Sequence, residues 1–242
     1  MSGSEDFLKT PVWYPVLASH TFLTSFIRLR PEAVKALADG CDGTVKSAVV
    51  IEAIESLRAP MAAIPGHCFA SVDCCSPTDT ERFITKGGAV FSPESAWRYL
   101  ARSAKVRAAA ERGDVEYICL RPYRRMNRTR EFRLFIRNGE LNAMSQYHLT
   151  RHFRRLEGVK QNFWHEAKAF VNSISWLLPV KDLVMDVYFT SSHRILIVDL
   201  NPWGAPTDPL LLRRWTRDWE ESAGIVLMPP PLRISGDVNV SF

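Results

Sequence analysis

The sequence lacks the features that would place it in a membrane or outside the cell. No apolar run is long enough to span a bilayer, and the first residues, MSGSEDF, contain neither the basic nor the apolar segment of a secretion signal. The five cysteines are odd in number and include no CxxC pair, so the sequence favours reduced thiols over a disulfide framework. These absences predict a cytoplasmic protein.

Lysine is scarce as well. Of the 31 basic residues, 8 are lysine and 23 are arginine, and the formal net charge is +5. Because the guanidinium group forms paired hydrogen bonds with phosphates and carboxylates, this bias predicts an anionic partner: a nucleotide, a nucleic acid or an acidic protein surface. A glycine-rich phosphate loop is missing, since Lys86-Gly87-Gly88 has too few glycines to surround a phosphate unaided.

The pattern that is present is typical of an α+β protein. The first half favours amphipathic helices with short strands, including one long helix from Ser92 to about Glu111 that begins with a serine cap and a proline. The second half is rich in strands, and Asn138-Gly139 is its strongest hairpin signal. We therefore predict an N-terminal lobe (residues 1–115) and a C-terminal lobe (residues 116–242).

Three further elements follow from local pattern. Residues 161–178 are predicted to form an amphipathic helix between hairpins. Near the end of the chain, another helix is predicted to begin at Thr207 or Asp208. The segment PVWYP at residues 11–15 contains two prolines and is predicted not to be helical throughout.

The stretch LVMDVYFTSSHRILIVDLNPWG (residues 183–204) carries the clearest chemical signal. Two runs of β-branched and aromatic residues flank a polar turn, which is typical of a β-hairpin. Asp186 interrupts the first run, and Asp199 and Asn201 end the second. Carboxylates brought together on a half-buried sheet repel each other unless a cation or a shared proton lies between them, and Mg²⁺ prefers such oxygen ligands. The hairpin therefore predicts half of a metal–phosphate site.

This interpretation depends on the hairpin turn. Side chains alternate across a strand, so residues 195, 197, 199 and 201 are expected to share one face. A two-residue or four-residue turn centred on Ser191-Ser192 makes Asp199 a diagonal neighbour of Asp186 on that face. A three-residue loop would put the two aspartates on opposite faces. The alternative is that these polar residues are solvated or cap the strand ends.

Arginine is concentrated in the region 121–133. The alternation in REFRLF directs Phe132 and Leu134 to the core and turns Glu131 and Arg133 toward a cleft, where Arg133 could hold a phosphate. The loop arginines between them form a solvated basic edge or contact a large anion. With the aromatic and basic residues 151–155, this region could also bind RNA.

Several motifs occur in a fixed order along most of the chain: Trp13-Tyr14-Pro15, CFASVDCCSPTD (68–79), LRPY (120–123), EFRLFI (131–136), NAMSQ (142–146), MDVYF (185–189) and VDLNPWGAPTDPLL (198–211). This series resembles the cell division cycle protein 123 family, a branch of the ATP-grasp superfamily. The resemblance implies an ATP-grasp fold, in which ATP lies between two α+β lobes with antiparallel sheets.

The resemblance also implies roles for individual residues. It makes the three polar hairpin residues ligands of Mg²⁺ and Arg133 a candidate phosphate contact. The stretch around Leu120 and Arg121 would be the hinge that receives adenine through backbone groups. Ser71 stands where the family has a lysine beside the nucleotide, and Lys86 or Lys105 could replace the lost charge. The family's Ser-Gln-Arg-Asp becomes SQYH (145–148), which removes another charge.

Three functions are compatible with these observations. Family members in eukaryotes are assembly factors for translation initiation factor two, so the first hypothesis is an Mg²⁺-ATP-binding assembly factor with a protein partner such as an initiation-factor subunit. The second is an ATP-grasp ligase or phosphotransferase that modifies a protein, peptide or RNA, with the acceptor near Arg133. The third is a basic RNA-binding protein that keeps the fold without the nucleotide.

Overall fold

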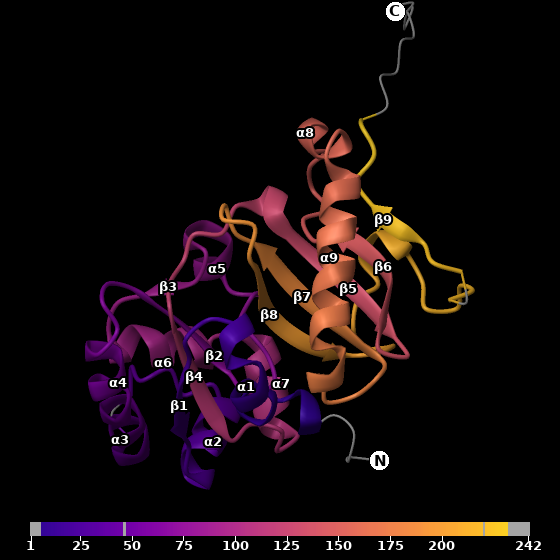
Figure 1. The fold of residues 1–242 in the computed structure, drawn as a ribbon. Coiled ribbons are helices and arrows are strands. Elements are labelled where there is room, and N and C mark those ends of the chain that lie inside the picture. The colour runs from indigo at the N-terminus through magenta and orange to yellow at the C-terminus, as the bar shows by residue number, and fades with distance from the viewer. Residues whose placement is uncertain (1–5, 46, 220, 232–242) are drawn as a thin grey trace, which may run out of the picture.

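Two β-sheets organise the chain, which the computed structural model describes over residues 6–45, 47–219 and 221–231. Among these residues the first sheet has the strand order β1-β4-β2-β3 and the second the order β8-β7-β5-β6-β9. The two sheets carry their own helices and stand side by side (Figure 1). Their strand pairs are antiparallel apart from β6 with β9. The predicted α+β architecture of two lobes with antiparallel sheets is therefore confirmed.

The N-terminal lobe is a sheet covered on one face by helices. Its strands are β1 (Ser25–Arg28), β2 (Cys68–Val72), β3 (Ala89–Val90) and β4 (Tyr117–Pro122), and its helices are α2 (Pro31–Ala38), α3 (Ala48–Ser56), α4 (Arg58–Ala62), α5 (Glu81–Lys86), α6 (Pro93–Ala101) and α7 (Ala104–Glu111). Alternation along the strands turns Val72 and Leu120 toward the helices, where they share a core with the fully buried Trp97. The opposite face of this sheet, with Phe69 and Arg121, lines the space between the lobes.

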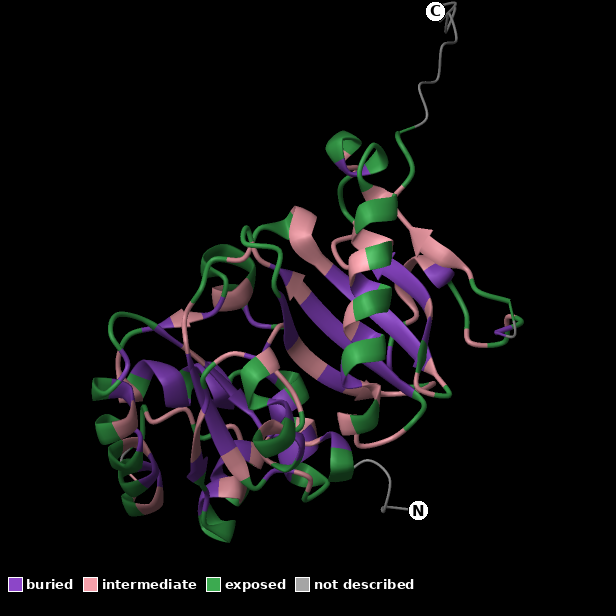
Figure 2. Ribbon diagram, in the orientation of Figure 1, coloured by how far each residue is buried: buried purple, intermediate pink, exposed green. Residues whose placement is uncertain are grey.

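In the C-terminal lobe one face of the sheet packs against a helix, and the other carries a cluster of tryptophans and residues that line the space between the lobes. Its strands are β5 (Glu131–Arg137), β6 (Glu140–Gln146), β7 (Leu183–Phe189), β8 (Ile195–Pro202) and β9 (Gly224–Val226), and its helices are α8 (Arg154–Glu157) and α9 (Lys160–Ile174). The predicted helix α9 packs Ala167, Val171 and Ile174 against one face and exposes its other side (Figure 2). Over the described residues, no helix combines the length and apolar character needed to cross a membrane.

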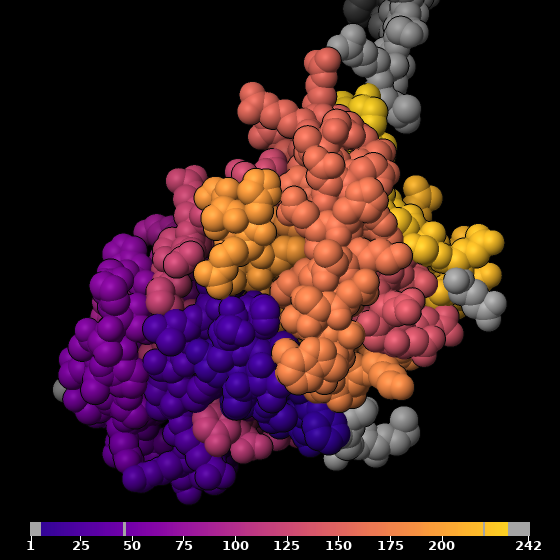
Figure 3. Space-filling model, viewed as in Figure 1, coloured from indigo at the N-terminus to yellow at the C-terminus, as the bar shows by residue number. Residues whose placement is uncertain are grey.

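Helix α1 (Thr10–Leu17) belongs to the core of the C-terminal lobe despite its place in the chain. Trp13 and Leu17 are buried there, and Figure 3 shows the N-terminal segment packed between the two lobes. The prediction that PVWYP is not helical throughout is therefore wrong. Pro11 falls in the first turn, where no donor is needed, and burial of the two apolar side chains outweighs the hydrogen bond that Pro15 cannot donate.

Strand β4 lies beyond the predicted lobe boundary at residue 115, yet it belongs to the first sheet. Leu120 stands opposite Ser25 of β1 and Ala70 of β2. The sheet of the N-terminal lobe therefore extends to Pro122, because the apolar residues of β4 complete the first core. Residues 232–242, at the end of the predicted C-terminal lobe, lie outside the described residues.

The helix predicted from Ser92 to Glu111 is divided into α6 and α7. Ser92 caps α6 as predicted, but that helix ends at Ala101, and Ser103 caps a new one by accepting a hydrogen bond from the amide of Val106. The Ser103 hydroxyl also donates to the carboxylate of Asp79. This second cap places Lys105 in the first turn of α7, beside the space between the lobes.

Two predicted local structures in the C-terminal lobe have opposite outcomes. The Asn138-Gly139 hairpin is confirmed, and both residues have the positive φ values, 55° and 79°, of a type I′ turn. The helix predicted from Thr207 or Asp208 is wrong, since this segment contains a 3₁₀ turn at Leu210–Leu212. A helix cannot continue there because Leu210 and Arg213 have positive φ, and the following tryptophans pack onto the sheet instead.

Candidate functional site

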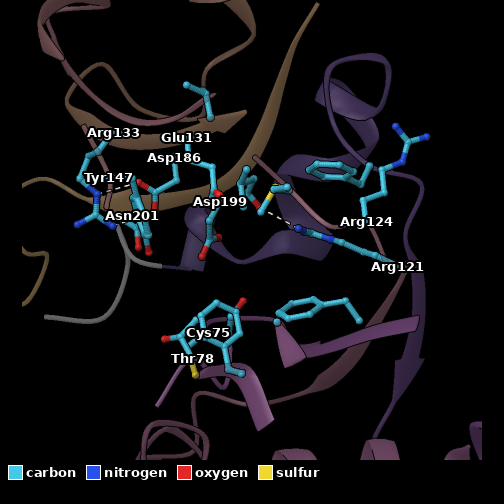
Figure 4. A pocket seen from close by; sticks show the side chains of 18 of the residues that line it. Cys75, Thr78, Arg121, Arg124, Glu131, Arg133, Tyr147, Asp186, Asp199 and Asn201 are labelled. Carbon is cyan, nitrogen blue, oxygen red and sulfur yellow. Dashed lines mark hydrogen bonds and ion pairs between the residues drawn. The ribbon is translucent and has the colours of Figure 1, made fainter. Parts of the chain in front are cut away.

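The two lobes enclose a cleft of about 240 Å³ that both sheets line. The N-terminal lobe contributes Arg121 of β4. The C-terminal lobe contributes Arg133 of β5, Asp186 of β7 and Asp199 of β8. Figure 4 shows these side chains around one space, with Cys75 on the opposite wall. The cleft therefore collects acidic and basic groups from strands that are far apart in the chain.

The β7–β8 hairpin has a three-residue loop. The amide of Thr190 donates to the carbonyl of Arg194 at 2.8 Å, and His193 adopts a positive φ of 60°. The predicted two-residue or four-residue turn is therefore wrong. Such a loop alone would leave the two aspartates on opposite faces of the sheet.

A β-bulge brings the aspartates back to one face. Asp186 stands directly opposite Asp199, and Val198 is left as an extra residue in β8. As a consequence Ile197 and Leu200, three positions apart, both pack into the core, whereas Asp199 faces the cleft. The predicted shared face is thus present, but the aspartates are direct cross-strand neighbours rather than diagonal ones.

Asn201 completes the polar group on this wall. Its Nδ2 donates to Oδ2 of Asp186 at 3.2 Å, and Oδ1 of Asp199 accepts a hydrogen bond from the amide of Leu200 at 3.0 Å. All three side chains line the cleft. Together they offer carboxylate and amide oxygens, the donors that Mg²⁺ prefers.

The pair of carboxylates is electrostatically strained. Burial, followed by the charge of Asp186, raises the pKa of Asp199 to about 7. A divalent cation between the two groups would relieve this repulsion. Within the described ranges no three or more His, Cys, Asp or Glu side chains form a metal site by themselves, so a metal here would take its remaining ligands from water or phosphate oxygens. The donor set therefore fits an Mg²⁺ ion shared with a phosphate group.

Strand β5 alternates as predicted. Glu131 and Arg133 line the cleft, and Phe132 and Leu134 belong to the core beneath α9. This alternation puts a guanidinium group next to the acidic pair. The position of Arg133 predicted from REFRLF is therefore confirmed, although a contact with phosphate stays a prediction.

Arg133 is engaged with the protein itself. Its Nε and Nη2 donate to the two carboxylate oxygens of Asp186 at 2.7 and 2.8 Å, and its Nη1 donates to the carbonyl of Asp208. The guanidinium also lies over the ring of Tyr147, 5.5 Å from its centroid. Because Arg133 and Asp186 are both almost fully buried, this paired contact fixes the orientation of the Asp186 carboxylate.

The predicted hinge at Leu120 and Arg121 lies inside a strand. Leu120 is fully buried in the first core, and both residues pair with β2 on one side. In the described pairings Leu120 also pairs with β1, whereas Arg121 pairs with β2 alone, so an adenine contact at this stretch stays a prediction. Arg121 does reach the cleft, but with its side chain: Nη1 donates to the carbonyl of Val198 at 2.8 Å.

Of the three residues considered for the missing family lysine, one lines the cleft. Ser71 is buried in β2 opposite Cys119 and is not among the residues that line the cleft. Lys86 is exposed at the end of α5 and meets the cleft residue Tyr123 only through its backbone carbonyl. Lys105 lines the cleft, with its Nζ 2.9 Å from Oγ1 of Thr78. The break between α6 and α7 positions it there.

An apolar wall was not predicted from the sequence. It comprises Phe22, Phe69, Phe83, Tyr123 and Met126. Alternation in β2 could have identified Phe69, because its neighbours Cys68 and Ala70 are core residues. The others come from loops and a short helix, where no periodic pattern shows the direction of a side chain.

Comparison with known proteins identifies the family. A model of the D123 family matches residues 98–222, which are 125 of the 242 residues, and the chain belongs to this family. The resemblance seen in the motifs is therefore confirmed.

Curated relatives match a shorter part. The chain is 35% identical over 105 residues to a translation initiation factor eIF2 assembly protein of Ajellomyces capsulatus and 34% identical over 92 residues to the protein of that name from Danio rerio. These alignments cover 42% and 38% of this chain, but only 24% and 25% of the relatives' length. The matched part is thus about a quarter of each relative.

One solved structure matches nearly the whole fold. Cdc123 from Schizosaccharomyces pombe superposes with a TM-score of 0.80 over 95% of this chain and 98% of that one, at 20% sequence identity. At this level of identity the match shows that the two chains share a fold.

Proposed function

We propose that this protein binds Mg²⁺-ATP in the cleft and acts as a nucleotide-dependent assembly factor for a translation initiation factor. The observation that supports the nucleotide most strongly is the pair Asp186 and Asp199, face to face with Asn201 beside them. A divalent cation would relieve the repulsion between the two carboxylates, and a phosphate would supply further oxygen ligands for that cation. The resemblance to ATP-grasp proteins implies that ATP supplies this phosphate.

The rest of the cleft suits the other parts of ATP. Positive charge comes from Lys105, Arg121 and Arg124, which all line it. The apolar wall that includes Phe69 and Tyr123 offers aromatic and aliphatic surface to a base. Bound Mg²⁺ would neutralise phosphate charge, and Arg133 would keep Asp186 directed at the ion.

The assembly role rests on the names of the relatives. Two of them are called eIF2 assembly proteins, so we propose an eIF2 subunit as the protein partner and the cytoplasm as the place of action. The two lobes, divided after Pro122, would form the walls of the nucleotide site. Arg125 and Arg128, exposed between β4 and β5, have no acidic partner among the described ion pairs and are available to an acidic protein surface.

Substitution of Asp199 tests the metal site. We expect Asp199→Ala to abolish the Mg²⁺-dependent part of ATP binding, because one carboxylate cannot hold the ion against the nearby guanidinium groups. Isothermal titration with ATP, with and without Mg²⁺, measures this. Asp39→Ala, at an exposed helix end in the N-terminal lobe, is the matched control and should bind as the unaltered protein does. Mg²⁺-dependent binding that survives Asp199→Ala would contradict the metal assignment.

Substitution of a lysine tests which positively charged side chain contacts the phosphates. Lys105→Ala should weaken ATP binding by about tenfold or more, since a charged hydrogen bond to a phosphate is lost. Lys86→Ala removes the same charge from an exposed position outside the cleft and should leave the affinity unchanged. Titration of both variants with Mg²⁺-ATP checks the difference. Equal losses would show that neither lysine is specific for the site.

The same preparations separate the three functions. Binding to a purified eIF2 subunit that strengthens with Mg²⁺-ATP would support the assembly factor. Steady ATP turnover with an acceptor would support the ligase or phosphotransferase. RNA binding that weakens steeply with salt, without any ATP binding, would support the third hypothesis and contradict the proposal.

A further inference from the structure

The bulge that aims Asp199 is held by a residue of the other lobe. Strand β8 is the outermost strand in the order of the second sheet, and Val198 is its extra residue. The carbonyl of Val198 accepts a hydrogen bond from Nη1 of Arg121 at 2.8 Å. Nε of Arg121 donates to Oγ1 of Thr24 at 3.1 Å, just before β1. One guanidinium therefore joins β4, the segment before β1 and the bulge.

A second contact holds the same part of β8. The hydroxyl of Thr21 donates to the carbonyl of Ile197 at 2.7 Å, and these two residues form an isolated parallel bridge. Two consecutive carbonyls of the bulge are thus bound from outside the second sheet. Because a bulge redirects the side chains that follow it, these contacts control the direction of the Asp199 carboxylate.

Arg121 acts on the backbone rather than on the carboxylate. Its side chain is 8% exposed, and in the described parts of the chain no ion pair joins it to Asp199. Burial lowers the pKa of Arg121, and the negative charge of Asp199 partly compensates. A buried guanidinium is costly to desolvate, so its placement at the bulge calls for a role there.

We propose that Arg121 is a positioning residue for the metal site: it fixes the bulge that directs Asp199 into the cleft, so that metal binding depends on contact between the two lobes. This inference rests on the proposed Mg²⁺-ATP function. It extends that function, because it makes a strand of the N-terminal lobe part of a metal site whose ligands all belong to the C-terminal lobe.

The direction of the change in metal affinity tests this role. If Arg121 acted only through its charge, Arg121→Met would bind a divalent cation more tightly, since a positive charge near two carboxylates is lost. If Arg121 positions Asp199, the same variant should bind about tenfold more weakly or worse, as is typical when a group behind a metal ligand is removed. Titration with Mn²⁺, which takes the same oxygen ligands as Mg²⁺, measures the affinity.

Two further variants control the experiment. Arg28→Met removes the same charge from an exposed position at the end of β1, in the same sheet but outside the cleft, and it should bind Mn²⁺ as tightly as the unaltered protein. Arg121→Lys keeps the charge and one donor, and it should recover part of the lost affinity. Loss in Arg28→Met equal to that in Arg121→Met would overturn the proposal.

Hydrogen exchange separates this inference from the proposed function. We expect the amides of residues 197–200 to exchange faster in Arg121→Met than in Arg28→Met, with or without metal. Unchanged exchange together with unchanged or tighter Mn²⁺ binding would overturn the role of Arg121. If the unaltered protein bound no Mn²⁺ either alone or together with ATP, the Mg²⁺-ATP function would be contradicted, and the exchange rates alone would decide whether Arg121 holds the bulge.

Discussion

Replacing Arg133 by methionine should lower the free energy of unfolding by about 3–5 kcal/mol, the usual effect of removing one partner from a buried ion pair. Asp186 is only 7% exposed, and Nε and Nη2 of Arg133 bind both of its carboxylate oxygens. Without the guanidinium, Asp186 keeps only the donor from Asn201 and faces the charge of Asp199 across the strand pair. Denaturation with urea, followed by circular dichroism, measures the loss.

Two controls show whether the effect belongs to the pair. Arg137→Met makes the same change at the end of the same strand, where the side chain is partly exposed and has no described ion pair, and should alter stability by no more than about 0.5 kcal/mol. The double variant Arg133→Met with Asp186→Leu should recover most of the stability, because neither partner of the buried ion pair is left without the other. If the double variant were as unstable as Arg133→Met, packing rather than charge would explain the loss.

The acidic residues of the candidate site were conspicuous in the sequence because polar side chains are rare in apolar strands. Asp186 and Asp199 interrupt runs of Val, Ile and Leu, and that contrast survives an error in the register. The sequence did not predict both the length of the β7–β8 turn and the fact that the two aspartates share one face of the sheet. A three-residue loop and a one-residue bulge each reverse the alternation, and their effects cancel.

A weak signal of the bulge exists in the sequence. In ILIVDL the core residues Ile195 and Ile197 are two positions apart, but the next core residue is Leu200, three positions on. This change of phase marks an extra residue. The position of the extra residue is ambiguous without the structure. Val198 is apolar like the core residues around it, so the sequence does not show that its side chain lines the cleft.

Contacts between the two lobes could not be predicted from local sequence patterns. LRPY contains an arginine between apolar residues, and neither spacing nor composition indicates that its side chain reaches the carbonyl of Val198, 77 positions along the chain. The position of Lys105 was equally hidden, because it depends on the Ser103 cap and on a hydrogen bond from Ser103 to Asp79. Long-range hydrogen bonds, not secondary structure, assemble the basic side of the cleft.

Asp199→Asn should stabilise the metal-free protein at high pH. The pKa of Asp199 is raised to about 7 by burial and by Asp186, whereas an unfolded aspartate titrates near 4. The folded state therefore favours the neutral acid, so this group's contribution to stability is complete below about pH 4 and is lost as the pH rises through about 7. Above that pH the cost of ionised Asp199 is on the order of 4 kcal/mol, which the amide of asparagine does not incur.

The stability of Asp199→Asn is therefore compared with that of the unaltered protein at two pH values and with added Mg²⁺-ATP. In urea denaturation at about pH 8 we expect Asp199→Asn to be more stable than the unaltered protein by a few kcal/mol, and at about pH 4 we expect the two to be equal. Added Mg²⁺-ATP should raise the stability of the unaltered protein and have little effect on the variant, because a bound ligand stabilises only the form that binds it.

Asp182→Asn provides the matched control, since Asp182 is exposed and accepts a hydrogen bond from the amide of Asn138 outside the cleft. It should show no gain at high pH. A gain at high pH in Asp199→Asn together with a lost response to Mg²⁺-ATP would mean that the protein accepts an unstable pair of carboxylates in order to bind its metal. Equal stability of the variant and the unaltered protein at both pH values would contradict the raised pKa, and with it the view that Asp186 and Asp199 need a cation.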